Sequence, residues 1–220
     1  MVLAFDTSSV AVTVAVHDGT AVLAARTELG AQAHGELLAP MVGSVLAEAG
    51  VGVEALTEIV VGVGPGPFTG LRVGLVTARV MSATLSIPVH GVCSLDALAA
   101  QAVAQGSVST SFAVATDARR KEVYLATYDL AGARITGPAV VLPAAVDPVV
   151  SGGPVVGEGA VLYAAAFVDA RAPRLVSAGW LATYAVARIV AGDKLGDTTP
   201  MYLRRPDAVA SAGHKRVTQS

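Results

Sequence analysis

The 220-residue sequence has one cysteine, Cys93, and only 15% charged residues. A single thiol excludes an internal disulfide and a cysteine cluster for zinc or iron. Lys and Arg number 15 against 17 Asp and Glu, so the chain lacks the positive excess typical of proteins that bind nucleic acid on their own. It also lacks an apolar run of the ~20 residues that cross a bilayer, and its start, "MVLAFDTSS", has no basic leader. We therefore expect a cytoplasmic protein without a membrane segment.

Hydrophobic residues are abundant by contrast, at 53% of the chain, with a mean hydropathy of +0.61. Two interpretations fit this composition. One is a large core rich in alanine and valine, and the other is an exposed apolar face that a partner covers.

The first half of the chain shows a regular order of elements. "VLAFDTS", "AVTVAVHDG" and "AVLAARTEL" read as three strands, and Asp18-Gly19 between the last two predicts a hairpin, which gives an antiparallel meander. The pattern then predicts a helix over 34–49, with a kink or a late start at Pro40, and a buried strand over 58–64. A helix over 69–85, a strand over 88–92 and a helix over 94–105, which Ser94 could cap, follow.

The second half repeats the start of the first. The spacing from Asp117 to Asp129 equals that from Asp6 to Asp18, and "VVGEGA" echoes "VVGVGP". This repetition predicts two related lobes, 1–106 and a shorter 107–206, followed by a flexible tail over 207–220. The Pro- and Gly-rich stretch 137–154 is predicted to be irregular, and the last helix is expected over 177–192.

The stretch "VVGVGPGPFTGLRVG", residues 60–74, does not match the known phosphate-binding loop motifs. It lacks the lysine of a Walker loop, and its glycines do not fit the spacing of a dinucleotide fingerprint. Free N–H groups at the following helix could attract an anion, but Pro65 and Pro67 each remove a donor. We expect a structural turn made by Gly64, Gly66, Thr69 and Gly70, in which Thr69 caps the helix.

Five motifs resemble those of the TsaB (YeaZ) family: "LAFDTSS", "GPGPFTGLRVG", "IPVHGVCSLDALA", "DARRKEVYLATYD" and "MYLRRPD". The resemblance implies an α/β, actin-like ATPase (ASKHA, ribonuclease H-like) fold with two related lobes and mixed sheets with flanking helices. It also implies a non-catalytic subunit that supports TsaD, with TsaE, in transferring threonylcarbamoyl to the adenosine next to the tRNA anticodon. Contact with tRNA would be made through the complex.

The resemblance implies that the apolar helices predicted over 34–49 and 69–85 contact TsaD. Without that partner, the same helices would contact a second copy of the chain in a homodimer. Ordinary core packing is the alternative for both helices. The expected interface residues are Leu37, Leu38, Met41, Val45, Leu71, Arg72, Leu75, Arg79 and Ser82.

The catalytic relative TsaD carries an H-M-E-G-H metal-binding stretch where this chain reads Ser94-Leu95-Asp96-Ala97-Leu98. Both histidines of that pattern are absent, and Asp96 reads as a first-turn carboxylate favoured by the helix dipole. We therefore expect no catalytic residue and no metal in this chain. The rival hypothesis is a metallopeptidase-like (glycoprotease) or ATP-dependent enzyme of the same fold.

Nucleotide binding has a weaker basis. Asp6, Thr7, Ser8 and Asp117 take the positions of the two phosphate loops of actin-like ATPases, and the alternatives are vestigial nucleotide binding or simple strand-end turns. No intrinsic cofactor is expected, and ATP or ADP would bind at the interface with the partner. Arg119 and Arg120 either bind phosphate, including that of tRNA, or are merely solvated.

Overall fold

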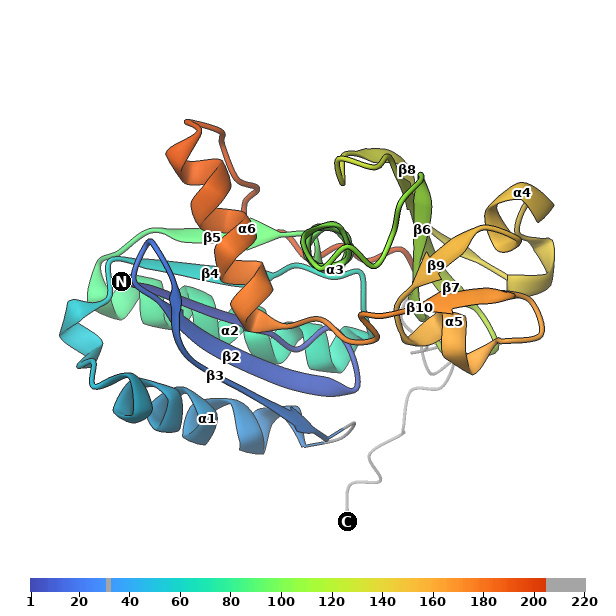
Figure 1. Ribbon diagram of the computed structural model, residues 1–220. Coiled ribbons are helices and arrows are strands. Elements are labelled where there is room, and N and C mark those ends of the chain that lie inside the picture. The colour runs from blue at the N-terminus through green and yellow to red at the C-terminus, as the bar shows by residue number, and fades with distance from the viewer. Residues whose placement is uncertain (31–32, 205–220) are drawn as a thin grey trace, which may run out of the picture.

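The protein consists of two lobes, each built on a five-stranded sheet, in the computed structural model shown in Figure 1. The structure describes residues 1–30 and 33–204. The predicted tail over 207–220 lies outside the described residues.

The first sheet has the order β3-β2-β1-β4-β5. β1, β2 and β3 form the predicted antiparallel meander, whereas β4 and β5 run parallel to β1. The hairpin turn after β2 uses Gly19 at φ 102°, and the Asp18 carboxylate accepts the N–H groups of Thr20 and Ala21. The strands are β1 (Val2–Asp6), β2 (Ala11–His17), β3 (Val22–Leu29), β4 (Glu58–Gly62) and β5 (Val89–Val92).

The second sheet repeats this topology, with the order β10-β9-β6-β7-β8 and the same pattern of parallel and antiparallel neighbours. The predicted duplication is thereby confirmed. The prediction of an irregular chain after Gly137 is wrong in part, because β8 pairs with β7; as an edge strand, β8 tolerates Pro138, whose missing N–H costs no ladder bond there. The strands are β6 (Phe112–Asp117), β7 (Val123–Tyr128), β8 (Arg134–Val141), β9 (Pro154–Val156) and β10 (Asp169–Arg171).

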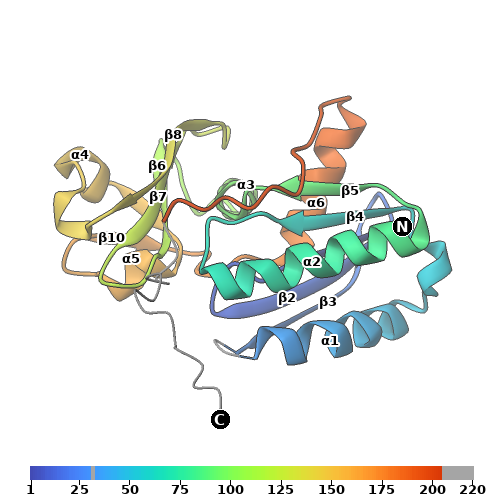
Figure 2. The same cartoon turned by 180° about the vertical axis from the view of Figure 1, so that it is seen from behind.

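Helices cover both faces of the first sheet (Figures 1 and 2). Leu3 and Phe5 pack on the side of α1 (His34–Ala49) and α2 (Phe68–Leu85), while Val2 and Ala4 face α6 (Ala178–Val190). This alternation is the period of two that a strand imposes on its side chains. α1 begins well before Pro40, so a late start at that proline is wrong, and Gly50 ends the helix at φ 64°.

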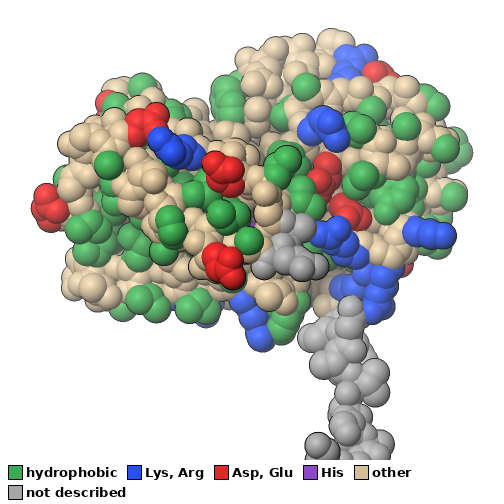
Figure 3. All heavy atoms as spheres, turned by 90° about the horizontal axis from the view of Figure 1, so that it is seen from below, with side chains coloured by type: hydrophobic (Ala, Val, Ile, Leu, Met, Phe, Trp, Pro, Cys, Tyr) green, Lys and Arg blue, Asp and Glu red, His purple; other side chains and the backbone are tan. Residues whose placement is uncertain are grey.

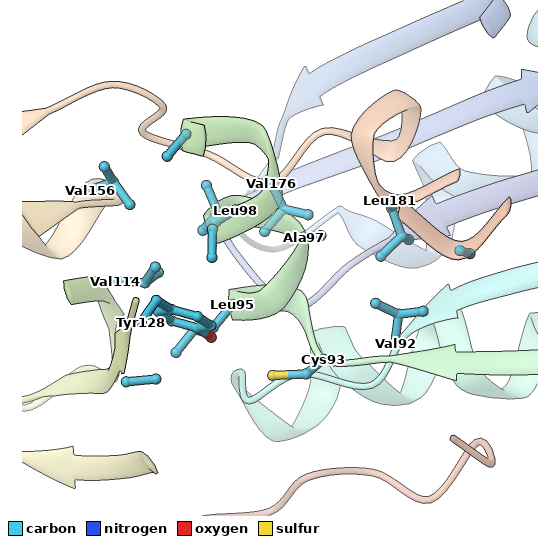
Figure 4. Close-up of a cluster of buried hydrophobic side chains, with 14 of the residues drawn as sticks. Val92, Cys93, Leu95, Ala97, Leu98, Val114, Tyr128, Val156, Val176 and Leu181 are labelled. Atoms are coloured by element: carbon cyan, nitrogen blue, oxygen red, sulfur yellow. The ribbon is translucent and has the colours of Figure 1, made fainter. Parts of the chain in front are cut away.

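A single apolar cluster joins the two lobes. At its centre lies α3 (Ser94–Ala104), whose Leu95 and Leu98 lie on the side of Val114 and Tyr128 from the second sheet (Figure 4). The same cluster contains side chains of β1 and α6 from the first lobe. Short helices complete the chain: η1 (Val53–Ala55), η2 (Pro143–Ala145), α4 (Pro148–Ser151) and α5 (Glu158–Leu162).

The predicted division of the lobes at residues 106 and 107 falls between the two sheets. α6, although it follows the second sheet in the chain, packs against the first one, and its Ala178 N–H donates to Thr13 Oγ1 of β2 at 2.9 Å. The first lobe is therefore assembled from both ends of the described chain. Within that chain, no helix is both long and apolar enough to cross a membrane.

Candidate functional site

The carboxylate of Asp6 is the centre of the site at the end of β1. It is fully buried: Oδ1 accepts the N–H and the hydroxyl of Ser8, both at 2.7 Å, and Oδ2 accepts the Ser94 hydroxyl at 2.5 Å. Ser94 begins α3, 88 residues away in sequence. These hydrogen bonds therefore connect the turn after β1, which is the first phosphate-loop position of the fold, to the first residue of α3.

Burial governs the ionisation of this carboxyl group. Desolvation raises the pKa of Asp6 above its ordinary value of 3.8, against the hydrogen bonds from Ser94 and Ser8, which lower it. Above pH 3.8, ionisation consequently stabilises the unfolded chain more than the folded one.

This raised pKa predicts how Asp6→Asn changes the pH dependence of stability. An asparagine keeps an acceptor for Ser8 but carries no charge, so we expect the wild type to lose stability relative to the variant as pH rises from about 4 towards 7. Above the folded-state pKa the difference should be constant. Urea unfolding of both proteins across this pH range measures the difference, and a gap that stays flat or closes with rising pH would contradict the assignment.

Thr7 and Ser8 are buried with Asp6. Thr7 Oγ1 donates to the carbonyl of Gly70 at 2.8 Å and accepts the N–H of Gly74 at 3.1 Å, so the side chain joins this turn to α2. All three phosphate-loop residues therefore direct their polar groups inside the protein. Their contact with a nucleotide stays a prediction, and it would require this network to open.

Asp117, the matching residue of the second lobe, lies at the end of β6 and has different partners. Its carboxylate accepts the N–H of Arg119 at 2.8 Å and pairs with the Arg119 guanidinium at 3.2 Å. The structure thus brings Asp6, Thr7 and Ser8 together but bonds Asp117 within its own hairpin.

The Gly-Pro loop sits directly on the Asp6 turn. A side chain at Gly66 would overlap the Ser8 carbonyl and lie 2.8 Å from Ser8 Cα, and the Gly64 carbonyl accepts the N–H of Ser94 at 2.8 Å. A Cβ atom at Gly70 would lie 2.8 Å from the Thr7 carbonyl oxygen. The glycines are thus needed for close backbone contact. The predicted cap by Thr69 is wrong, because α2 begins at Phe68 without a side-chain cap and Thr69 is exposed.

Ser94 and Leu98 stand at the positions of the two histidines of the TsaD pattern, and both side chains pack inside the protein. Ser94 and Leu98 are both fully buried, and the Asp96 carboxylate accepts the hydroxyl of Tyr128 at 2.8 Å and a guanidinium N–H of Arg134 at 2.9 Å. The predicted cap by Ser94 is wrong, since its hydroxyl serves Asp6 instead. The described residues contain no group of three or more His, Cys, Asp or Glu able to hold a metal ion. A metal does not fit this position.

Five of the predicted interface residues face the core instead of a partner. Because α1 and α2 turn these side chains towards the first sheet, they are between 0% and 6% exposed, and the prediction is wrong for them. They are Leu38, Met41, Val45, Leu71 and Leu75.

The other four predicted interface residues, Leu37, Arg72, Arg79 and Ser82, are exposed or half-buried. Arg72 and Arg79 of α2 bind the segment 198–202, which follows α6. Arg72 Nε donates to the Tyr202 hydroxyl at 3.0 Å, and Arg79 Nε donates to Thr198 Oγ1 at 2.8 Å.

Sequence reasoning missed two residues on the outer face of α2. Val76 and Val80 are 57% and 58% exposed, and their spacing of four places them on one side of the helix. The sequence does not reveal that they are exposed, because they lie in the same apolar run as buried residues such as Leu75. We call Val76 and Val80 the α2 outer face.

Comparison with known proteins agrees with this architecture. Residues 26–189 match a family model described as TsaD, tRNA N6-adenosine threonylcarbamoyltransferase. A Mycobacterium tuberculosis protein is 44% identical over 214 residues, which cover 94% of this chain and 93% of that protein. Escherichia coli TsaB, named a tRNA threonylcarbamoyladenosine biosynthesis protein, is 35% identical over 128 residues, or 58% of this chain and 54% of the relative.

Solved structures extend the similarity to the whole fold. YeaZ from Pseudomonas aeruginosa is 32% identical with a TM-score of 0.75, and the alignment covers 92% of this chain and 99% of that one. An Arthrobacter polyphosphate/ATP-glucomannokinase, at 13% identity and a TM-score of 0.52, shares the fold alone, covering 84% of this chain and 98% of its own. The predicted actin-like, two-lobed fold is confirmed. The chain belongs to the TsaB (YeaZ) family, within the group that the threonylcarbamoyltransferase model describes.

Proposed function

We propose that this chain is a cytoplasmic, non-catalytic subunit that supports a TsaD-type enzyme, together with TsaE. The partner enzyme transfers a threonylcarbamoyl group to the adenosine next to the anticodon of tRNA. The family model and the names of the E. coli and Bacillus subtilis relatives support the pathway.

The proposal of a non-catalytic role rests on the residues found at the start of α3. Ser94 replaces the first histidine and bonds Asp6, and Leu98 replaces the second and fills the core between the lobes. A chain with these substitutions lacks the imidazole pair that would hold a metal. Its contribution to the reaction is therefore to bind the enzyme that does carry the pair.

The α2 outer face is our proposed docking surface for that enzyme. Two neighbouring valines that are each more than half exposed form an apolar contact point, and burying such a surface favours association. Without the enzyme, the same face would pair two copies of this chain in a homodimer. We place ATP or ADP between the subunits, because Asp6, Thr7 and Ser8 are sealed within this chain.

Reconstitution tests this function directly. A purified TsaD-type enzyme, TsaE, a tRNA transcript and threonylcarbamoyl adenylate are assayed for modified tRNA with and without this chain. We expect the chain alone to transfer nothing and the mixture to gain at least roughly tenfold in rate, equivalent to about 1.4 kcal/mol of activation free energy. Transfer by the isolated chain, stoichiometric metal on it, or an unchanged rate in the mixture would contradict the proposal.

A further inference from the structure

The turn between β6 and β7 holds three consecutive cations in an unusual backbone conformation. Arg119, Arg120 and Lys121 have φ values of 63°, 53° and 63°, and the turn is closed by two backbone hydrogen bonds of 3.0 Å that involve Glu122. Left-handed geometry costs a non-glycine residue about 1–2 kcal/mol. Such strain persists mainly at functional positions, and here it displays three exposed, long, positively charged side chains.

Two of these cations, Arg119 and Arg120, border the first of two adjoining cavities where the lobes meet, and Arg119 also borders the second. The first, of about 240 Å³, is lined by three arginines and three aromatic side chains, and the second, of about 510 Å³, shares Pro67, Thr69 and Arg119 with it. No Asp or Glu occurs among the described residues that line either cavity. We call the first cavity the basic trough; its charged and aromatic residues are Phe68, Arg119, Arg120, Tyr124, Tyr202 and Arg204.

Positive charge dominates the exposed part of the trough. Arg119 pairs with Asp117, but the guanidinium side chain is 50% exposed and the carboxylate only 11%. Arg204 pairs with Glu122, and here the two side chains are similarly exposed, at 23% and 27%; Arg204 also donates to the Ala118 carbonyl at 2.8 Å. Seen from below, Lys and Arg side chains gather beside the junction of the lobes (Figure 3). The lining of the trough is therefore cationic, with the paired carboxylates of Asp117 and Glu122 outside it, although the whole chain carries a formal net charge of −2.

The combination of arginines with the partly exposed ring of Tyr202 fits a nucleic-acid strand better than a free nucleotide. One guanidinium group can donate two parallel N–H hydrogen bonds to a phosphate group, and bases stack on the faces of aromatic rings. The Phe68 and Tyr202 rings lie 4.8 Å apart, and Tyr202 is 39% exposed. Ser8, from the turn after β1, is closed off beneath the Gly-Pro loop.

We infer that the basic trough binds the phosphodiester backbone of the tRNA that the complex modifies. This inference rests on the proposed function and adds to it a direct RNA contact made by this chain. The strained turn supplies phosphate contacts, and the partly exposed ring of Tyr202 supplies a surface for an unpaired base.

The test is a tRNA titration by fluorescence anisotropy at 50 and 200 mM KCl, with the full-length chain alone and with its assembled pair with the TsaD-type enzyme. The trough variant is Arg119→Gln/Arg120→Gln, and the control Arg26→Gln/Arg188→Gln removes the same charge from surface ion pairs with Glu48 and Asp193. We expect the trough variant to weaken tRNA binding on the order of tenfold at 50 mM salt and to lower the salt slope by about two. The control should stay within about twofold of wild type.

A second variant separates binding from folding. Arg119→Asn/Arg120→Asn suits left-handed geometry, so we expect it to unfold at a higher urea concentration than wild type while binding tRNA as weakly as the glutamine variant. An unchanged affinity and salt slope in both variants would overturn the inference, as would loss of ADP binding with tRNA binding intact. Association of each variant with the enzyme is measured in parallel, so failure of the proposed docking is seen separately from failure of the RNA contact.

Discussion

Gly62→Ala is expected to remove roughly 3 kcal/mol or more from the free energy of unfolding, a large effect for the addition of one methyl group. A Cβ atom at this position of β4 would overlap Asp6 Oδ2 and lie 2.9 Å from Ser94 Oγ. The buried carboxylate would have to move, which would leave its hydrogen-bond donors without a partner. Urea unfolding at neutral pH measures the loss.

Gly43→Ala is the matched control for this change. Gly43 lies on the exposed side of α1, and no atom lies within 4 Å of a Cβ built there. An alanine in that helix should stabilise the protein by about 0.5–1 kcal/mol. If Gly62→Ala unfolded at the same urea concentration as wild type, the Asp6 network would have no part in holding the site closed.

Val76→Asp/Val80→Asp is expected to weaken association with the TsaD-type enzyme by at least about 100-fold, or about 2.8 kcal/mol. The reason is that two carboxylates would have to be buried without partners at the centre of an apolar contact. Calorimetric titration of the two purified proteins measures the affinity. The circular dichroism spectrum and unfolding midpoint should be unchanged, because both side chains point outward.

The control for this interface is Val149→Asp/Val190→Asp, at valines 84% and 81% exposed and away from α2. It should leave the affinity within about twofold, as surface changes outside an interface do. Equal binding by the α2 variant would place the docking surface elsewhere. Leu75→Asp is no substitute, because Leu75 is only 3% exposed and its loss would unfold the protein.

The order of strands and helices could be read from the sequence because its signals are local. The strand pattern around Asp6 recurs around Asp117, and this repetition predicted two lobes that the sheets confirm. β8 was not predicted, since Gly137 and Pro138 suggest a loop and only pairing along the edge of β7 makes that segment a strand.

The candidate site could be predicted only in part, since it depends on contacts between distant residues. Asp6 and Ser94 are 88 positions apart, and no local pattern signals that one closes over the other. Likewise, Leu75 and Val76 belong to the same apolar helix, and only the sheet beneath α2 decides which of them is buried. The left-handed turn at Arg119 carries no sequence signal, because arginine does not favour that conformation.

The apolar cluster around α3 has a mechanical consequence. Leu95 and Leu98 join both sheets through one buried cluster. Swinging the halves apart would expose these leucines to water, at about 1.5–3 kcal/mol for each side chain. We therefore expect little hinge motion between the two lobes.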